Sequence, residues 1–120
     1  MLVIGMLFLL LTILFGAIVL TAILKNKKTP KPIVLLHGCA ALFSILVLAS
    51  YIAAGHFDYL LITSVVLFIL AALGGLSLLI IDVLHKSISK VIIIVHPLIA
   101  LSGFIVLFIY FLHWLSGNRV

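Results

Sequence analysis

The sequence predicts an all-α integral membrane protein, a four-helix bundle built from two tandem two-helix repeats. Of its 120 residues, 68% are hydrophobic and only 8% are charged. A soluble domain of this size could not bury so much apolar surface, so we expect lipid to be the solvent. The apolar residues form four runs, each long enough to cross a hydrocarbon core about 30 Å thick. Pairs of scarce residues also recur at a constant offset of 59 positions.

The four apolar runs are expected to form a single membrane domain over residues 1–120. The expected helices cover residues 2–24, 32–55, 59–84 and 90–115. The first run lacks a basic region after Met1 and a small-x-small cleavage site. We therefore expect it to be an uncleaved transmembrane helix rather than a signal peptide. Thr29 is a suitable cap for the second helix, and proline is tolerated in its first turn. Residues 55–58 form a tight turn before the third helix, and residues 87–89 precede the fourth.

The offset of 59 residues indicates an internal repeat. The matched pairs are Gly16/Gly75, Lys27/Lys86, Lys31/Lys90, His37/His96 and Tyr51/Tyr110. Lys, His and Tyr are rare in this chain, so their coincidence is informative, whereas matching leucines are not. Two spans per repeat relate the halves by an axis along the membrane normal. The second and fourth helices are then expected to face each other across the bundle centre.

Positive charge is concentrated in the first and third connections. The lysines concerned are Lys25, Lys27, Lys28 and Lys31 in the first, and Lys86 and Lys90 in the third. Loops rich in Lys and Arg stay on the cytoplasmic side, so we expect a multi-pass protein with cytoplasmic basic loops and both termini outside. The net charge of +5 then reflects topology and contact with anionic membrane lipid, and no nucleic-acid partner is expected.

Each repeated histidine is followed by small residues on its own helical face. A helix turns by about 100° per residue, so positions four and seven residues later share the face of the histidine. A glycine on each of the other two helices lies at a similar depth, roughly 13 to 20 Å from the lysine level. Two opposed imidazoles with small residues below them predict a slot for a planar macrocycle. The residues of this slot are His37, Ala41, Ser44, His96, Ala100, Gly103, Gly16 and Gly75.

Neutral imidazoles are competent axial ligands of haem iron, provided that the second ring nitrogen bonds to a partner such as a backbone carbonyl. Pro97 follows His96 and frees the carbonyl four residues earlier, which is one source of such a partner. A histidine within a membrane span indicates function, and a repeated pair strengthens the indication. The duller interpretation is that His37 and His96 only hydrogen-bond across the bundle.

This arrangement resembles the b-type cytochromes of respiratory membranes, in which one histidine from each of two helices holds the haem iron. The resemblance implies that His37 and His96 are the metal ligands of one haem b, nearer the cytoplasmic face. In the diheme respiratory cytochrome b, the second and fourth helices each carry two histidines fourteen positions apart. This chain has Tyr51 and Tyr110 at the second pair of positions, so a second haem of that type is not implied.

Lys31 and Lys90 each lie six residues before a histidine of the slot, on the cytoplasmic side. Lysines at that height could meet the propionates of a haem, although snorkelling to lipid headgroups explains them equally well. The expected function is electron transport within the membrane, by a carrier or an oxidoreductase subunit rather than a complete enzyme. Its expected partners are a quinone, a larger membrane redox complex or a second copy in a homodimer.

Several alternatives stay open at the level of sequence. A cofactor-free structural or assembly subunit of a larger membrane complex is the main one, and proton or ion permeation through the histidine pair is another. His56 and His113, at the outer ends, are a second candidate site for a haem or a quinone headgroup, or simply interfacial residues. Zinc and copper are less favoured, because no carboxylate lies near the level of His37 and His96.

Overall fold

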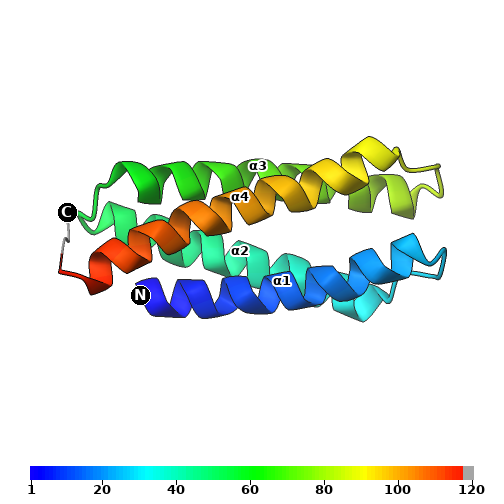
Figure 1. Cartoon of the computed structure of the whole chain (residues 1–120). Helices are drawn as coiled ribbons and strands as arrows, with labels where there is room; N and C mark the ends of the chain where they lie inside the picture. The colour runs from blue at the N-terminus through cyan, green and yellow to red at the C-terminus, as the bar shows by residue number, and fades with distance from the viewer. Residues whose placement is uncertain (118–120) are drawn as a thin grey trace. The chain divides into compact units, whose positions relative to one another are not determined.

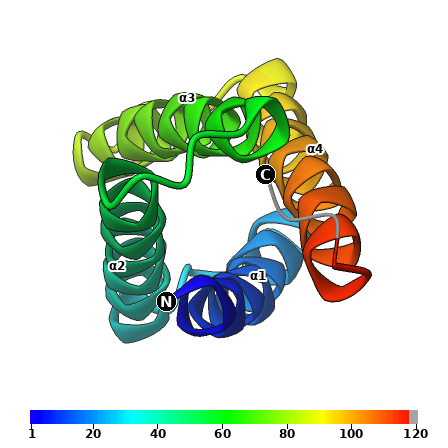
Figure 2. The same ribbon diagram turned by 90° about the vertical axis from the view of Figure 1, so that its left-hand side faces the viewer.

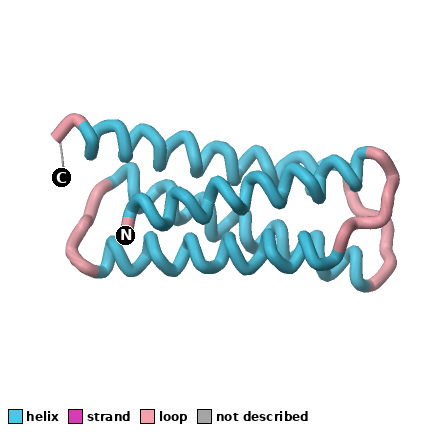
Figure 3. Tube along the Cα trace, turned by 90° about the horizontal axis from the view of Figure 1, so that it is seen from below, coloured by secondary structure: helices cyan, strands magenta, loops and turns pink. Residues whose placement is uncertain are grey.

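The computed structural model describes residues 1–117 and is all-helical, with four α-helices (Figure 1). They are α1 (Leu2–Leu24), α2 (Lys31–Ala53), α3 (Tyr59–Val83) and α4 (Lys90–Leu115). Each helix is long and apolar enough to cross a membrane, which confirms the predicted helical class. The ends of α2 and α3 differ from the expected ends by one or two residues, and the connections between helices are short (Figure 3).

The chain divides into two compact units, Met1–Val47 and Leu48–Val120. In the first unit, α1 and the beginning of α2 run alongside each other as a helical hairpin (Figures 1 and 2). The rings of Phe8 and Phe43 meet between these helices with their centroids 4.4 Å apart. The buried residues of this unit are Leu2, Gly5, Met6, Leu9, Ala40 and Ser44.

The second unit contains the end of α2 and the antiparallel pair α3 and α4, which pack along their length. Asp58 begins α3 as its N-cap, because its carboxylate accepts hydrogen bonds from the backbone N–H groups of Leu60 and Leu61. The buried residues of this unit are Leu48, Tyr51, Leu61, Ser64, Val65, Phe68, Ala71, Gly103, Leu107 and Tyr110.

Helices α1 and α3 end in the same way, 59 residues apart. Asn26 and His85 each adopt a left-handed conformation, with φ of 54° and 55°. The N–H of Lys27 donates to the carbonyl of Ala22, and the N–H of Lys86 donates to the carbonyl of Ile81 at the matching position. This Schellman-type ending satisfies carbonyls that the end of a helix would otherwise leave unpaired.

Burial is uneven along the helices. None of residues 10–39 and none of residues 72–102 is buried, so both histidines of the predicted slot lie in the less buried stretches. Large apolar side chains are widely exposed, with Leu14 at 61% and Leu35 at 68% as examples. Exposed apolar faces on helices whose backbone bonds are made internally are typical of contact with lipid.

Candidate functional site

His37 is oriented within the first unit by a backbone carbonyl of α1. Its Nδ1 lies 2.8 Å from the carbonyl oxygen of Thr12. A carbonyl oxygen can only accept, so Nδ1 carries the hydrogen and donates it, and the lone pair of the neutral ring then belongs to Nε2. The ring is half-buried, one turn and a half into α2.

His96 has the same environment in the second unit. Its Nδ1 donates to the carbonyl oxygen of Ala71 on α3, again at 2.8 Å and across 25 positions of the chain. Thr12 and Ala71 are themselves 59 residues apart, as His37 and His96 are. The two imidazoles therefore share one tautomer and one kind of anchor.

Gly16 and Gly75 make room for these two imidazoles. A Cβ at position 16 would lie 2.9 Å from Cε1 of His37, and a Cβ at position 75 would lie 3.0 Å from Cε1 of His96. Both distances are shorter than ordinary contacts of a Cβ, so alanine at position 16 would force the ring of His37 to shift, and alanine at position 75 would require the ring of His96 to give by a few tenths of an ångström. The sequence singled out these glycines as borders of a slot, whereas within each unit the imidazole itself occupies the space.

The anchoring carbonyl and the glycine belong together in helix geometry. The carbonyl of Thr12 is four residues before Gly16, and the carbonyl of Ala71 is four residues before Gly75. In an α-helix, the residue four positions later donates its N–H to that carbonyl, and its side chain flanks the oxygen. A glycine there leaves the second lone pair of the oxygen open to the imidazole.

The need for a carbonyl partner could be foreseen from chemistry, but its source differs from the carbonyl that Pro97 frees. Both anchors come from the neighbouring helix of the same unit. The sequence signal that could have identified these anchors is the pair of glycines at matching positions in both halves. Each glycine leaves the carbonyl four residues before it accessible to a side chain from the neighbouring helix.

The other small residues of the predicted slot have different surroundings. Ala41 and Ala100 are partly exposed, whereas Ser44 is fully buried and its hydroxyl donates to the carbonyl of Ala40 on its own helix. Gly103 lies against α3, since a Cβ there would be 3.0 Å from Cε1 of Phe68. Gly103 therefore serves the packing of α3 on α4.

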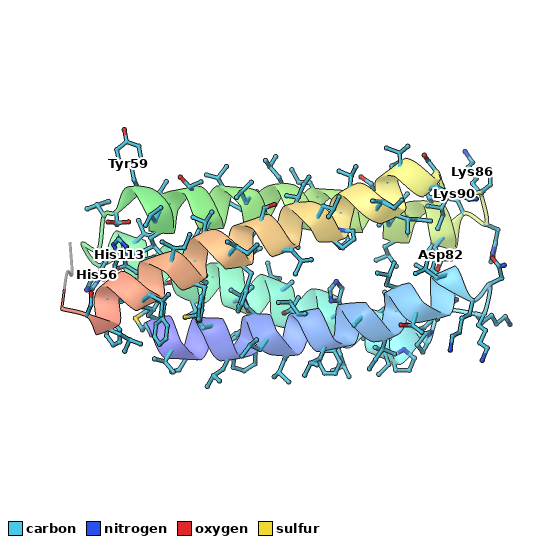
Figure 4. All side chains as sticks on the ribbon, viewed as in Figure 1. His56, Tyr59, Asp82, Lys86, Lys90 and His113 are labelled. Atoms are coloured by element: carbon cyan, nitrogen blue, oxygen red, sulfur yellow. The ribbon has the colours of Figure 1, made fainter. Side chains whose placement is uncertain are left out.

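Lys31 and Lys90 are the first residues of α2 and α4, and both are exposed. In the second unit, Lys90 lies at the same end as Asp82 and Lys86, whereas His56 and His113 lie at the opposite end (Figure 4).

His56, at the end of the second unit opposite Lys90, forms a hydrogen bond and a ring contact with Tyr51. Its Nδ1 donates to the carbonyl of Tyr51 at 3.0 Å, and the two rings stack with centroids 3.9 Å apart and planes 13° apart. The buried side chains of Tyr51 and Tyr110 lie close enough to interact electrostatically. The sequence placed these tyrosines at matching positions but did not reveal that they meet.

Within each unit, this arrangement orients one imidazole whose Nε2 has the chemistry of a metal ligand. Among residues 1–117, no three His, Cys, Asp or Glu side chains gather to hold a metal ion by themselves. No known protein family matches the chain, and no curated protein or solved structure matches it.

Proposed function

We propose that this chain is a membrane-embedded b-type cytochrome in which His37 and His96 would hold the iron of one haem b. The observation that carries the proposal is the equal anchoring of the two imidazoles, each donating from Nδ1 to a carbonyl at 2.8 Å. This bond fixes the ring and raises the basicity of Nε2, the nitrogen that would bind iron. A haem bound in this way supplies reversible one-electron transfer.

We propose further that the four helices cross the membrane as two tandem repeats, with the basic connections in the cytoplasm and both termini outside. The repeat is supported by the matching cap residues Asn26 and His85 and by the matching anchors of His37 and His96. The sidedness is supported by the distribution of lysine among the connections.

The residues of this chain have separable roles in that site. Gly16 and Gly75 leave the space that the imidazoles of His37 and His96 occupy. Lys31 and Lys90 offer exposed ammonium groups at the ends of the ligand helices, suited to carboxylates such as haem propionates. Ala41, Ser44 and Ala100 are the remaining small residues on the histidine faces of α2 and α4, whereas Gly103 serves the packing of α3 on α4.

In this role the protein is a carrier or a subunit that exchanges electrons with a quinol, a partner complex or a second copy. The anchored ring of His56 supports a second site at the other end of the second unit, for a second haem with His113 or for a quinone headgroup.

A second candidate function is that of a cofactor-free structural subunit of a larger membrane complex. The packing of each imidazole into a glycine gap supports it equally well, because a histidine that only joins two helices would have the same contacts. Both functions therefore predict the same anchors and differ in whether Nε2 binds iron.

The absorption spectrum of the purified protein separates the two functions. A b-type cytochrome should show the sharp reduced bands of low-spin haem, with one haem per chain by pyridine haemochrome. His37→Leu and His96→Leu should each abolish the bis-imidazole spectrum, whereas His85→Gln, at an exposed turn, should leave it unchanged. A colourless protein, purified from membranes with ample haem, would reject the cytochrome and favour the structural subunit.

A further inference from the structure

The connection between α1 and α2 is a strongly basic surface that the proposed electron transfer does not use. Lys25, Lys27 and Lys28 follow the end of α1 at Leu24, and all three are exposed. Asn26 turns the chain in its left-handed conformation, and the N–H of Lys27 is fixed to the carbonyl of Ala22 at 2.9 Å. Hydrogen bonds to the last carbonyls of α1 therefore fix the backbone of this connection at Lys25 and Lys27.

The first unit contains no acidic residue to offset these charges. The two acidic residues of the chain, Asp58 and Asp82, both belong to the second unit. The first unit therefore has no carboxylate of its own to offset these lysines, and their charge attracts anions from outside it.

We propose that this α1–α2 connection binds the headgroups of anionic phospholipids. The lysines stand directly after an apolar helix of 23 residues, so their aliphatic stems lie along the hydrocarbon boundary while the ammonium groups reach the phosphates. A lysine at such a surface favours an anionic over a zwitterionic lipid by up to about fivefold. The inference rests on the membrane insertion proposed above and is independent of haem.

The second unit provides a matched connection with weaker basic character. Lys86 is the counterpart of Lys27, with the same backbone bond at the same kind of helix end. Asp82, however, precedes Lys86 by four residues and lies at the same end of the unit (Figure 4), whereas the counterpart of Asp82 in the first unit is Ile23. The negative charge of Asp82 near Lys86 weakens the attraction of this connection for an anion.

Lipid selectivity can be measured on the full chain reconstituted into phosphatidylcholine vesicles. Spin-labelled phosphatidylglycerol and spin-labelled phosphatidylcholine report how much of each lipid the protein immobilises. The variants are Lys25→Gln/Lys27→Gln/Lys28→Gln together, and the matched single variants Lys27→Gln and Lys86→Gln.

We expect the wild-type protein to immobilise phosphatidylglycerol severalfold more than phosphatidylcholine, and the triple variant to lose most of that preference. Lys27→Gln should lower the preference more than Lys86→Gln, and molar salt should weaken it because the charges are exposed. Inorganic phosphate at constant ionic strength should have no effect on headgroups held at a bilayer.

An unchanged preference in the triple variant, or an equal loss in Lys27→Gln and Lys86→Gln, would overturn the inference. Displacement by inorganic phosphate at constant ionic strength would also overturn it, because the surface would then be a site for a free anion. A protein that immobilises neither labelled lipid would instead contradict the membrane insertion on which the inference rests.

Discussion

The imidazole of His37 lies in the space that Gly16 leaves on α1, where a Cβ would approach Cε1 of the ring to 2.9 Å. The same helix supplies the carbonyl of Thr12 that accepts the hydrogen bond from Nδ1 of His37. One glycine thus permits both the position of the ring and access to its anchor, so the orientation of His37 depends on a residue that makes no polar contact.

Gly16→Ala should therefore cost the first unit about 1 to 3 kcal/mol in overpacking, offset by the gain of about 1 kcal/mol that alanine brings as a better helix former. Gly38→Ala on α2 is the matched control, because nothing lies within 4 Å of a Cβ at position 38. Alanine is the better helix former by about 1 kcal/mol, so the control should be neutral or stabilising. Unfolding of the detergent-solubilised protein, followed by circular dichroism, measures both variants. Equal stability of the two variants would contradict the contact between Gly16 and His37.

The second unit offers a sharper comparison between neighbouring glycines. Gly75→Ala would bring a Cβ to 3.0 Å from Cε1 of His96, whereas Gly74→Ala would leave an ordinary contact of 3.7 Å with Nδ1 of the same ring. If the proposed haem is bound, we expect Gly75→Ala to shift the ring by a few tenths of an ångström and to convert low-spin haem partly to a high-spin form, with a shifted midpoint potential. Gly74→Ala should keep the low-spin spectrum.

A structural role alone would change stability in Gly75→Ala without changing any spectrum, because there would be no haem to report. Low-spin haem with an unshifted potential in Gly75→Ala would instead show that His96 ligates from a different orientation. These two results separate the failure of the proposed function from the failure of the positioning argument.

The fold was predictable because its signal is local. Long apolar runs, and lysines between them, define helices such as α1 without any knowledge of their neighbours. The occupant of a glycine gap is not local, since it depends on the rotation of one helix against another. Gly16 and Gly75 were therefore identified by their offset, but the ring that fills each gap was not. Gly103 illustrates the same point, because the side chain that covers it is Phe68 on α3.

The interaction between the buried side chains of Tyr51 and Tyr110 should contribute up to about 1 kcal/mol to stability. Tyr51→Phe and Tyr110→Phe should each cost up to that amount, because each removes one hydroxyl from the interacting pair of buried side chains. The double variant should cost less than the sum of the single variants, which a double-mutant cycle measures. Additive losses would mean that the two hydroxyls do not interact. Neither single variant should alter the low-spin haem spectrum.

At the end of α3, a histidine occupies a backbone conformation that glycine adopts more easily. His85 adopts φ of 55°, a conformation that costs an L-residue other than glycine or asparagine roughly 1 to 2 kcal/mol. Asparagine stands at the matching end of α1, where Asn26 adopts φ of 54°. His85→Gly and His85→Asn should therefore raise the thermal midpoint, with glycine at least equal to asparagine because C′ positions favour it. Asn26→Gly, which replaces a residue that tolerates the conformation, should give a smaller gain. Because a glycine also gains freedom in the unfolded chain, the net benefit of His85→Gly should stay near 1 kcal/mol or below. A lower midpoint for both His85 variants would mean that the imidazole makes a stabilising contact that outweighs the backbone strain.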